Sequence, residues 1–215
     1  MARGVLITIE GVDGAGKSTL VDAIAINLRR VGLAVEVLRE PGGVELAERI
    51  RELLRDPASS PSARAEALLY AAARAQLTSA KLEPLLAAGT HVLLDRFVDS
   101  SLAYQGVGRG LGVEEVRGLN EFATAGLQPD RTLYLRVSPA TGRARQGARA
   151  EDPDRMERED GEFFARVAAA YEQLAREDPQ RIRTIDADNE PAQVLEDSSR
   201  AIADLFDRTG AFRAR

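Results

Sequence analysis

The sequence predicts an α/β fold in which five parallel strands form one sheet and helices cover both of its faces. Short apolar runs alternate along the chain with longer segments of helical periodicity. These runs are almost continuously apolar, as in strands that are buried on both sides. A length of 215 residues with 44% hydrophobic and 29% charged side chains suits one globular domain, which we expect to span 1–215.

Each expected strand is a short apolar run followed by a polar or glycine-containing turn. In chain order, the expected strands are Val5–Ile9, Ala34–Leu38, His91–Leu94, Arg131–Val137 and Ile182–Ile185. The expected helices fill the intervals at 17–31, 44–55, 62–88, 99–106, 113–126, 139–147, 160–177 and 191–208. In the first helix, Leu20, Ile24 and Leu28 recur on one face, and the proline- and serine-rich stretch 56–61 predicts a loop.

The most specific motif is Gly11-x-x-x-x-Gly16-Lys17-Ser18, which joins the first expected strand to the first expected helix. Its glycines, which include Gly14, let the backbone adopt positive φ and turn successive N–H groups toward a phosphate at the helix N-terminus. Lys17 would reach the outer phosphates, and the Ser18 hydroxyl would bind Mg²⁺. A glycine-rich turn without a ligand is the alternative. The strand–loop–helix context favours phosphate binding and a three-layer P-loop NTPase fold.

Lysine is rare in this chain, yet the loop contains it. Lys17 and Lys81 are the only lysines among the 29 basic residues. A compact point charge on a flexible stem suits a phosphate loop better than a planar guanidinium does, so this usage supports the phosphate-binding interpretation.

The third expected strand ends in an acid and a base. Asp95 is placed to hold Mg²⁺ or its water opposite the phosphate loop, and Arg96 is placed to pair with a second phosphate. An ordinary strand-end ion pair is the alternative. His91 is the only histidine and opens the same strand at the end away from the expected site, so we interpret it as structural.

Further polar groups lie at strand ends or on helix faces. Arg39, Glu40 and Pro41 begin a turn after the second strand, which can equally be a tight turn with a surface ion pair. Tyr70 and Arg74, spaced i,i+4, would offer an aromatic plate and a bidentate donor to a planar base. A core tyrosine beside a snorkelling arginine is the alternative. A polar cluster at helical spacing then follows Arg96 and consists of Ser100, Ser101, Tyr104 and Gln105.

Five arginines lie in one polar stretch that is also rich in acids. They are Arg143, Arg145, Arg149, Arg155 and Arg158. A solvated, salt-bridged face is the default interpretation of such a run. The functional interpretation is a short lid, at about 143–160, that brings arginine to the transferring phosphates.

The composition excludes several classes of protein. Without cysteine the chain forms neither disulfides nor thiolate metal sites, which fits a reducing cytoplasm. The formal net charge of −5 argues against a nucleic-acid-binding surface. No apolar run has the length of a membrane span, and there is no signal peptide. We therefore expect a cytoplasmic protein with a small-molecule substrate and with neither nucleic acid nor membrane as a partner.

In combination, these motifs resemble the bacterial thymidylate kinases from about Val5 to about Asp188. The family's phosphate loop, Arg-Glu-Pro-Gly-Gly turn and Asp-Arg-aromatic motif stand at 11–18, 39–43 and 95–97. Its Ser-x-x-x-Ala-Tyr-Gln-Gly cluster is partly present before residue 107. The resemblance implies a homodimeric kinase that uses ATP and Mg²⁺ to phosphorylate dTMP to dTDP, in dTTP synthesis.

The resemblance also implies roles in binding dTMP. Tyr70 would stack on thymine, and Arg74 would read a carbonyl of that base, which Gln105 would help to hold. Tyr104 would pack against the sugar and disfavour a 2′-hydroxyl, while Asp13 would lie near the 3′-hydroxyl. The whole set expected to bind dTMP is Asp13, Arg39, Glu40, Pro41, Tyr70, Arg74, Arg96, Ser100, Ser101, Tyr104 and Gln105.

The donor site and the catalytic groups follow from the same resemblance. The set expected to bind the donor nucleotide is Gly11, Val12, Asp13, Gly14, Ala15, Gly16, Lys17, Ser18, Thr19 and Arg145. The expected metal-binding residues are Ser18 and Asp95, and the expected catalytic residues are Lys17, Arg96, Asp13, Arg149 and Arg155. Because the loop has no arginine, the lid would supply it through Arg149 or Arg155.

The chain departs from the family pattern by a longer lid around 151–153 and at three single positions, and none of these departures removes a reacting group. The single positions are Val44, Ala73 and Leu77. A monophosphate kinase for another base, such as UMP or AMP, is one alternative function, against which Tyr70, Arg74 and Tyr104 argue. A non-kinase P-loop ATPase switch is the other.

Overall fold

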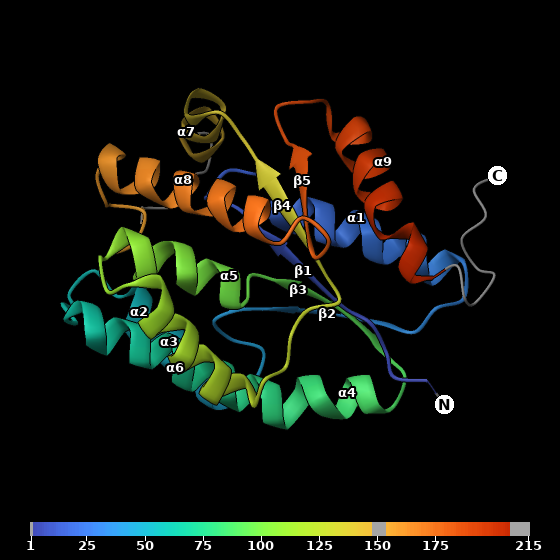
Figure 1. The fold of residues 1–215 in the computed structure, drawn as a ribbon, viewed down its shortest axis with the longest axis horizontal. Coiled ribbons are helices and arrows are strands. Elements are labelled where there is room, and N and C mark those ends of the chain that lie inside the picture. The colour runs from blue at the N-terminus through green and yellow to red at the C-terminus, as the bar shows by residue number, and fades with distance from the viewer. Residues whose placement is uncertain (1, 148–153, 207–215) are drawn as a thin grey trace.

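Five parallel strands form the centre of the molecule in the order β2-β3-β1-β4-β5 (Figure 1). The computed structural model describes residues 2–147 and 154–206. The strands are β1 (Leu6–Glu10), β2 (Val35–Arg39), β3 (His91–Asp95), β4 (Arg131–Arg136) and β5 (Ile182–Asp186). All four neighbouring pairs are parallel. The predicted fold class is therefore confirmed, and each strand end lies within one residue of its expected position.

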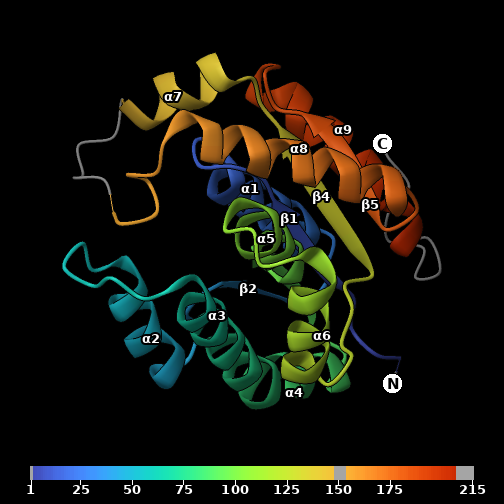
Figure 2. The same cartoon turned by 60° about the vertical axis from the view of Figure 1, so that its left-hand side comes forward.

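Helices cover both faces of the sheet and make three layers (Figures 1 and 2). They are α1 (Lys17–Arg30), α2 (Glu45–Arg55), α3 (Ala63–Leu77), α4 (Glu83–Ala87), α5 (Val98–Ser101), α6 (Val113–Thr124), α7 (Pro139–Gly147), α8 (Gly161–Glu177) and α9 (Pro191–Ile202). Successive side chains of a strand point to opposite faces. Ile7 and Ile9 accordingly pack in the core beneath α1 and α9, whereas Leu6 packs in the core beneath α4 and α8.

Two expected helices are interrupted by π-helical turns. The helix expected at 62–88 is α3, a π-helical turn η1 (Thr78–Leu82) and α4, because Pro84 lacks the N–H that a continuous α-helix needs. The helix expected at 99–106 is α5 followed by η2 (Leu102–Gly108), also π-helical. The last expected helix ends as the short 3₁₀ turn η3 (Ala203–Leu205).

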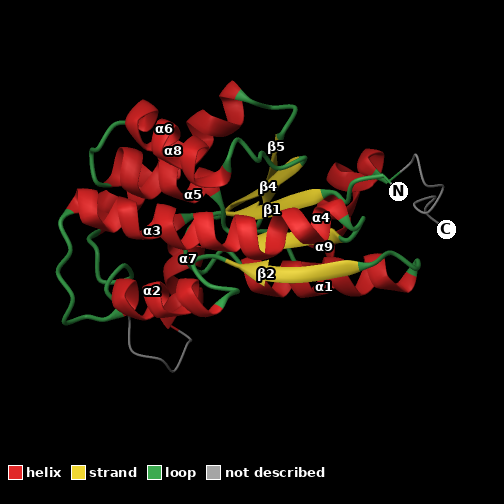
Figure 3. Cartoon of the chain, turned by 90° about the horizontal axis from the view of Figure 1, so that it is seen from below, coloured by secondary structure: helices red, strands yellow, loops and turns green. Residues whose placement is uncertain are grey.

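The carboxyl ends of three strands meet at one edge of the sheet, with Arg39 and Ile9 both in register with Asp95. Figure 3 shows the strands in the interior with helices around them. Side chains fix two of the helix starts nearby: Ser62 accepts the N–H of Ala65 at the start of α3, and Asp160 accepts that of Phe163 at the start of α8. In the part of the chain that the structure describes, no helix has the length and apolarity to cross a membrane.

Candidate active site

The loop between β1 and α1 has the backbone of a phosphate cradle. Gly14 and Gly16 have φ angles of 81° and 91°, in the left-handed region that side chains avoid. A Cβ on Gly14 would also lie 2.5 Å from the carbonyl oxygen of Gly142 in α7, so the loop packs directly against that helix. Gly16 is the N-cap of α1, where unpaired N–H groups and the helix dipole favour an anion.

Lys17 begins α1 and is turned back over the loop. Its Nζ donates to the carbonyl oxygens of Gly11 and Val12 at 3.1 and 3.0 Å. The side chain is only 8% exposed. Burial, with a contribution from the charge of Arg96, lowers the pKa of Lys17 to about 8. Phosphate oxygens at this loop would supply the negative charge that raises this pKa again.

A hydroxyl and a carboxylate meet beside the loop. Ser18 Oγ, on α1, donates to Asp95 Oδ2, at the end of β3, over 2.9 Å. Two neutral or anionic oxygens of this kind suit Mg²⁺, which commonly takes one or two protein ligands and completes its shell with water and phosphate. Within residues 2–147 and 154–206 there is no group of three or more acidic or histidine side chains that could hold a metal by protein ligands alone. The donor set therefore fits Mg²⁺ that arrives with a nucleotide.

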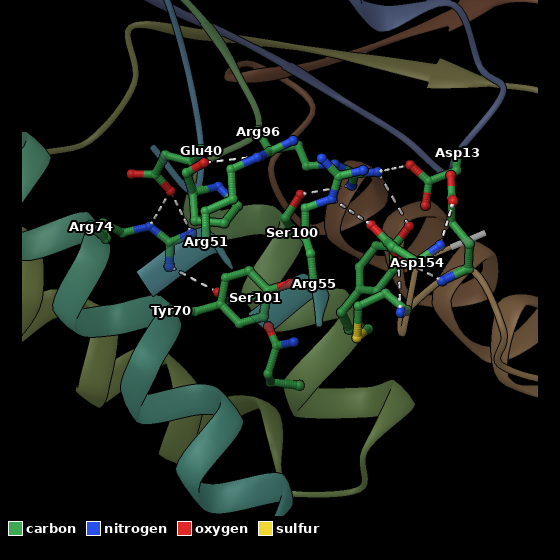
Figure 4. A pocket seen from close by; sticks show the side chains of 15 residues that line it. Asp13, Glu40, Arg51, Arg55, Tyr70, Arg74, Arg96, Ser100, Ser101 and Asp154 are labelled. Carbon is green, nitrogen blue, oxygen red and sulfur yellow. Dashed lines mark hydrogen bonds and ion pairs between the residues drawn. The ribbon is translucent and has the colours of Figure 1, made fainter. Parts of the chain in front are cut away.

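A cleft next to the loop gathers most of the residues expected to bind the acceptor (Figure 4). Its lining includes Asp13, Glu40, Pro41, Tyr70, Arg74, Arg96, Ser100, Ser101, Tyr104 and Gln105. These residues come from the loop, the turn after β2, α3, the turn after β3, α5 and η2. Their roles stay predictions, but residues more than 90 positions apart in the chain converge on one space.

Arg74 is 2% exposed and is held on all sides of its guanidinium. Its Nε donates to Glu40 Oε2 at 2.7 Å, and its Nη2 donates to the Phe97 carbonyl oxygen at 2.9 Å. Its Nη1 donates to Ser101 Oγ at 2.8 Å and to Asn120 Oδ1. Burial raises the pKa of Glu40, although the charge of Arg74 opposes that rise. Arg74 therefore has a fixed orientation at the cleft wall.

Arg96 connects the cleft to the phosphate loop. Its Nη2 donates to Asp13 Oδ1 at 2.7 Å, and its Nη1 donates to Ser100 Oγ at 3.2 Å. The guanidinium carbon lies 5.2 Å from the centre of the Tyr104 ring. In Figure 4, Arg96 lies between Glu40 on one side of the cleft and Asp13 on the other. A non-glycine φ of 71° at Arg96 aims the side chain into this position.

Glu10, the last residue of β1, supports this turn from below. Its carboxylate accepts the N–H groups of Phe97 and Ser100 at 2.7 and 3.3 Å and the Tyr171 hydroxyl at 2.9 Å. Burial, and then the charge of Asp99, raise the pKa of Glu10 to about 7 against the opposing hydrogen bond from Ser100. Glu10 was not among the predicted site residues, because nothing in the local sequence marks a buried carboxylate there.

Of the residues expected to bind dTMP, Arg39 alone lies outside this cleft, and Arg145, which was expected at the donor nucleotide, lines another cavity. Arg39 is 53% exposed, forms an ion pair with Glu48 at 3.0 Å, and lines a different cavity together with Ser18 and Asp95. Arg145 lies beside the other end of the loop, where its Nη1 donates to the Ala187 carbonyl oxygen at 3.0 Å. The cavity there is lined by Ala15, Gly16, Thr19, Leu20, Ala23, Arg145, Ala187, Asn189, Pro191, Ala192, Val194 and Leu195.

Of the two arginines expected to act from the lid, Arg155 is among the described residues. Arg149 lies outside the described residues. Arg155 has an ion pair from its Nη1 to Glu66 Oε2 at 2.7 Å, and its Nε donates to the Leu54 carbonyl oxygen at 3.0 Å. Its guanidinium is thus engaged with α2 and α3 rather than with the phosphate loop.

Two arginines of the cleft were not among the predicted residues. Arg51 and Arg55 line it from α2, and Arg51 Nη1 donates to the Pro41 carbonyl oxygen at 3.0 Å. Arg55 Nε donates to Asp154 Oδ2 at 3.1 Å. Burial, and then the neighbouring charge of Arg39, lower the pKa of Arg51. Their i,i+4 spacing, the same as that of Tyr70 and Arg74, was the available signal.

Comparison with known proteins gives one consistent result. A sequence model of the family described as thymidylate kinase matches residues 9–198. A thymidylate kinase of Bacillus pumilus is 43% identical over 94% of this chain and 97% of its own length. Thymidylate kinases of Alkalilimnicola ehrlichii and Enterococcus faecalis are each 45% identical, over 97% and 95% of this chain and 96% and 98% of their own lengths.

Proposed function

The chain belongs to the thymidylate kinase family, and from that premise we propose that it transfers the γ-phosphoryl group of Mg·ATP to dTMP. Phosphorylation of dTMP to dTDP is the activity of this family. The proposal adds the donor, the metal, the residues that bind each substrate and the association of two chains.

The observation that carries the proposal is the position of Arg96. Its ion pair to Asp13 of the phosphate loop, together with its contact with the Tyr104 ring, joins a donor site to an acceptor cleft. A phosphate held by Arg96 would lie next to a phosphate held by the loop. Such placement of two anions in line is most of what phosphoryl transfer requires of a protein.

The acceptor half of the proposal assigns dTMP to the cleft of Figure 4. Tyr70 would supply an aromatic face for the base, and Arg74, one helical turn further along the same face of α3, would present its guanidinium to a carbonyl of that base. Tyr104 closes the sugar end, where a bulky ring disfavours a 2′-hydroxyl. Asp13 would lie near the 3′-hydroxyl, and Arg96 would bind the phosphate.

The donor half assigns the phosphates of ATP to the loop amides and Lys17. Ser18 and Asp95 would hold Mg²⁺, which would neutralise charge on the phosphates. Arg145 and the small side chains around Ala187 would contact adenine. Arg149 is our first choice for the transfer arginine from the lid at about 143–160, because Arg155 is already paired with Glu66.

Association into a homodimer is also part of the proposal. Large apolar side chains are exposed on three helices that lie side by side in Figures 1 and 2. They are Leu46 and Leu53 on α2, Leu68 on α3 and Phe122 on α6. Phe122 is 88% exposed, an unfavourable position for a phenyl ring that is not covered by a partner. Sedimentation of the wild type and of Phe122→Glu tests this part, since the charge should favour the monomer. We place this single-domain enzyme of residues 1–215 in the cytoplasm.

A coupled ADP-release assay with dTMP, UMP and AMP as acceptors, and with no acceptor, tests the function. We expect turnover with dTMP to exceed that with UMP or AMP by at least about 10²-fold, because the pocket polar groups match one base. Preference for UMP or AMP would indicate a kinase for another base. ADP release that does not depend on any acceptor would indicate an ATPase switch.

A further inference from the structure

A buried carboxylate outside the expected site lies one helical turn from the acceptor cleft. Glu66 is in α3, four residues before Tyr70, and is 1% exposed. Tyr70 and Arg74 continue the same i,i+4 face and line the cleft. A buried glutamate is stable only when its charge is compensated, so its partners identify what it holds.

Four N–H groups meet the two oxygens of Glu66. Oε1 accepts from Gln105 Nε2 at 2.9 Å and from Arg109 Nε at 3.1 Å. Oε2 accepts from Arg109 Nη2 at 3.1 Å and is 2.7 Å from Arg155 Nη1. Burial alone would raise the pKa of Glu66, but the hydrogen bonds from Arg109 and Gln105 outweigh it and hold the pKa below its ordinary value. The carboxylate is therefore ionised at neutral pH, with its acceptor positions filled.

The hydrogen bond to Gln105 determines which way that amide faces. An ionised carboxylate only accepts, so the NH₂ group of Gln105 must face Glu66. Its carbonyl oxygen is then on the other side of the amide, and within residues 2–147 and 154–206 it accepts no hydrogen bond. Gln105 lines the cleft, so this oxygen is an acceptor available to a base. Thymine offers an N3–H donor, whereas cytosine has an acceptor at N3.

The same carboxylate holds one wall of the cleft. Residues 154–159 are the last part of the segment expected to form the lid and lead into α8, and Asp154, Met156 and Glu157 line the cleft. Arg155 fixes this segment through Glu66 and through the Leu54 carbonyl oxygen. Arg109 Nη1 adds an ion pair to Glu159 at 2.6 Å. The position of this wall and the orientation of the Gln105 amide therefore depend on one side chain.

Resting on the proposed function, we infer that Glu66 is a positioning residue for acceptor specificity. It turns the side-chain carbonyl oxygen of Gln105, Oε1, toward the base. Through Arg155, it also keeps residues 154–159 against the acceptor. Glu66 touches neither the phosphates nor the reacting atoms. Its contribution therefore belongs to acceptor binding and base choice, and Arg155 acts through Glu66 rather than on the transferring group.

Glu66→Gln is the first test, because it keeps the shape and replaces one acceptor oxygen by an N–H donor. That donor faces N–H groups, so the Gln105 amide must turn or lose its bond. We expect the KM for dTMP to rise about 10- to 100-fold, the scale of a lost charged hydrogen bond. The kcat and the KM for ATP should stay within about 3-fold. The preference in kcat/KM for dTMP over dCMP should narrow by about tenfold or more.

Arg155→Leu and the double variant complete a cycle. Arg155→Leu should raise the KM for dTMP with little change in kcat. The variant that combines Glu66→Gln with Arg155→Leu should have the same KM for dTMP as Glu66→Gln alone. The control is Asp204→Asn, which takes the carboxylate from another buried arginine, Arg131, without touching the cleft. The control should leave the KM and the base preference unchanged.

Unchanged KM and base preference in a folded Glu66→Gln protein would overturn the inference. So would a large loss of kcat with an unchanged KM in Arg155→Leu, because that pattern belongs to a residue acting in the transition state. If Glu66→Gln does not fold, Arg155→Leu alone tests the inference: a raised KM for dTMP with a nearly unchanged kcat supports it, and a lowered kcat with an unchanged KM contradicts it. Failure of the wild type to phosphorylate dTMP would instead contradict the proposed function.

Discussion

The two nucleotide sites that we propose for this chain are built differently. The acceptor cleft is made of long side chains that already bond to one another, such as Arg74 with Glu40 and Gln105 with Glu66. The proposed donor site beside α1 is made of loop backbone and of a cavity lined mostly by aliphatic side chains, with Thr19, Asn189 and Arg145 as its polar members. One site is organised by side-chain networks, and the other by the conformation of a glycine loop.

The difference indicates where selectivity resides. Buried polar groups reject a ligand that cannot match them, because an unmatched group keeps its full desolvation cost. Backbone amides recognise any phosphate and contribute rate rather than base choice. Substitutions on the donor side should therefore reduce the rate most, and those on the acceptor side should change affinity and selectivity.

The largest effect is expected from the lid arginine on the donor side. Arg149→Ala should lower kcat by about 10³- to 10⁵-fold while raising the KM for dTMP far less, since a guanidinium that meets the transferring group acts in the transition state. Single-turnover transfer with both substrates saturating measures this. Arg143→Ala and Arg158→Ala are the controls and should react at close to the wild-type rate. Equal rates in all three variants would remove the lid from the mechanism.

Lys17→Ala should have the next largest effect. Loss of one charge contact made in the transition state costs about 10²- to 10³-fold in rate. The fold should survive, because the ammonium bonds to the loop carbonyl oxygens of Gly11 and Val12 and pairs with Asp13 at 3.8 Å, all within the loop. Circular dichroism and kcat for the variant and for Lys81→Ala provide the comparison. Near-normal turnover by folded Lys17→Ala protein would show that this loop is not the donor site.

Glu10, beneath the turn that carries Arg96, should make stability depend on pH. Its folded-state pKa of about 7 is above its ordinary value of 4.5, so folding favours the protonated form. The stabilisation is fully present below the unfolded pKa and is lost as pH rises through about 7. Relative to Glu10→Gln, the wild type should lose about 2–3 kcal/mol of unfolding free energy between about pH 5 and 8.5.

Urea unfolding of both proteins across this range measures that difference. The charged and titratable groups around Glu10 are Asp99, Arg96, Lys17 and Tyr171, and they are the same residues in both proteins. The exposed variant Glu48→Gln serves as the control, with a flat difference expected. A constant difference between wild type and Glu10→Gln would refute the raised pKa.

Arg74→Ala tests the acceptor network. The kcat/KM for dTMP should fall by about 10- to 100-fold, from a lost charged hydrogen bond, while the KM for ATP changes little. Unfolding free energy should also fall, by about 3–5 kcal/mol, because the buried Glu40 carboxylate loses its counter-charge.

Arg74→Lys separates these two effects. A lysine keeps a positive charge for Glu40 but lacks the fork that also reaches Ser101 and Asn120. Most of the stability should return while the loss in kcat/KM persists. If both properties recover together, Arg74 does not read the base.

The smallest effect is expected from changing the base of the donor. GTP and dATP should replace ATP with losses in kcat/KM within about tenfold, because the cavity beside Arg145 has few polar groups to leave unmatched. With dTMP, dCMP and UMP as acceptors, the values of kcat/KM should differ from one another by more than they do among the three donors. Equal ranges of kcat/KM for donors and acceptors would contradict the proposed difference between the two sites.

What could be predicted from the sequence was local. The strands follow from apolar β-branched runs, and the loop follows from glycines at the turn into α1, so both were located closely. The grouping of Tyr70, Arg74 and Tyr104 in one cleft agrees with expectation because i,i+4 spacing and strand ends fix their directions.

The remainder depends on contacts between distant segments. Glu66 stands among alanines in a helix and has the sequence pattern of an exposed acid, while its partners Arg109 and Arg155 are 43 and 89 residues away. Arg39 and Arg51 could not be ranked either, because only the packing of α2 on the turn after β2 decides which of them faces the cleft. The π-helical turn in η2, which no local pattern marks, also sets the direction of Gln105.

The two lysines of this chain should differ in their reactivity toward amine-directed reagents. Lys81 is paired with Glu36 at 2.9 Å, whereas the Lys17 amine has a pKa of about 8 and is therefore partly neutral, and nucleophilic, in mildly alkaline buffer. A small uncharged amine-directed reagent would meet a single reactive lysine in the loop, and a bound phosphate would protect it by raising its pKa. The extent of covalent labelling, read by mass spectrometry, would then report how much of the loop is occupied, without any enzymatic turnover.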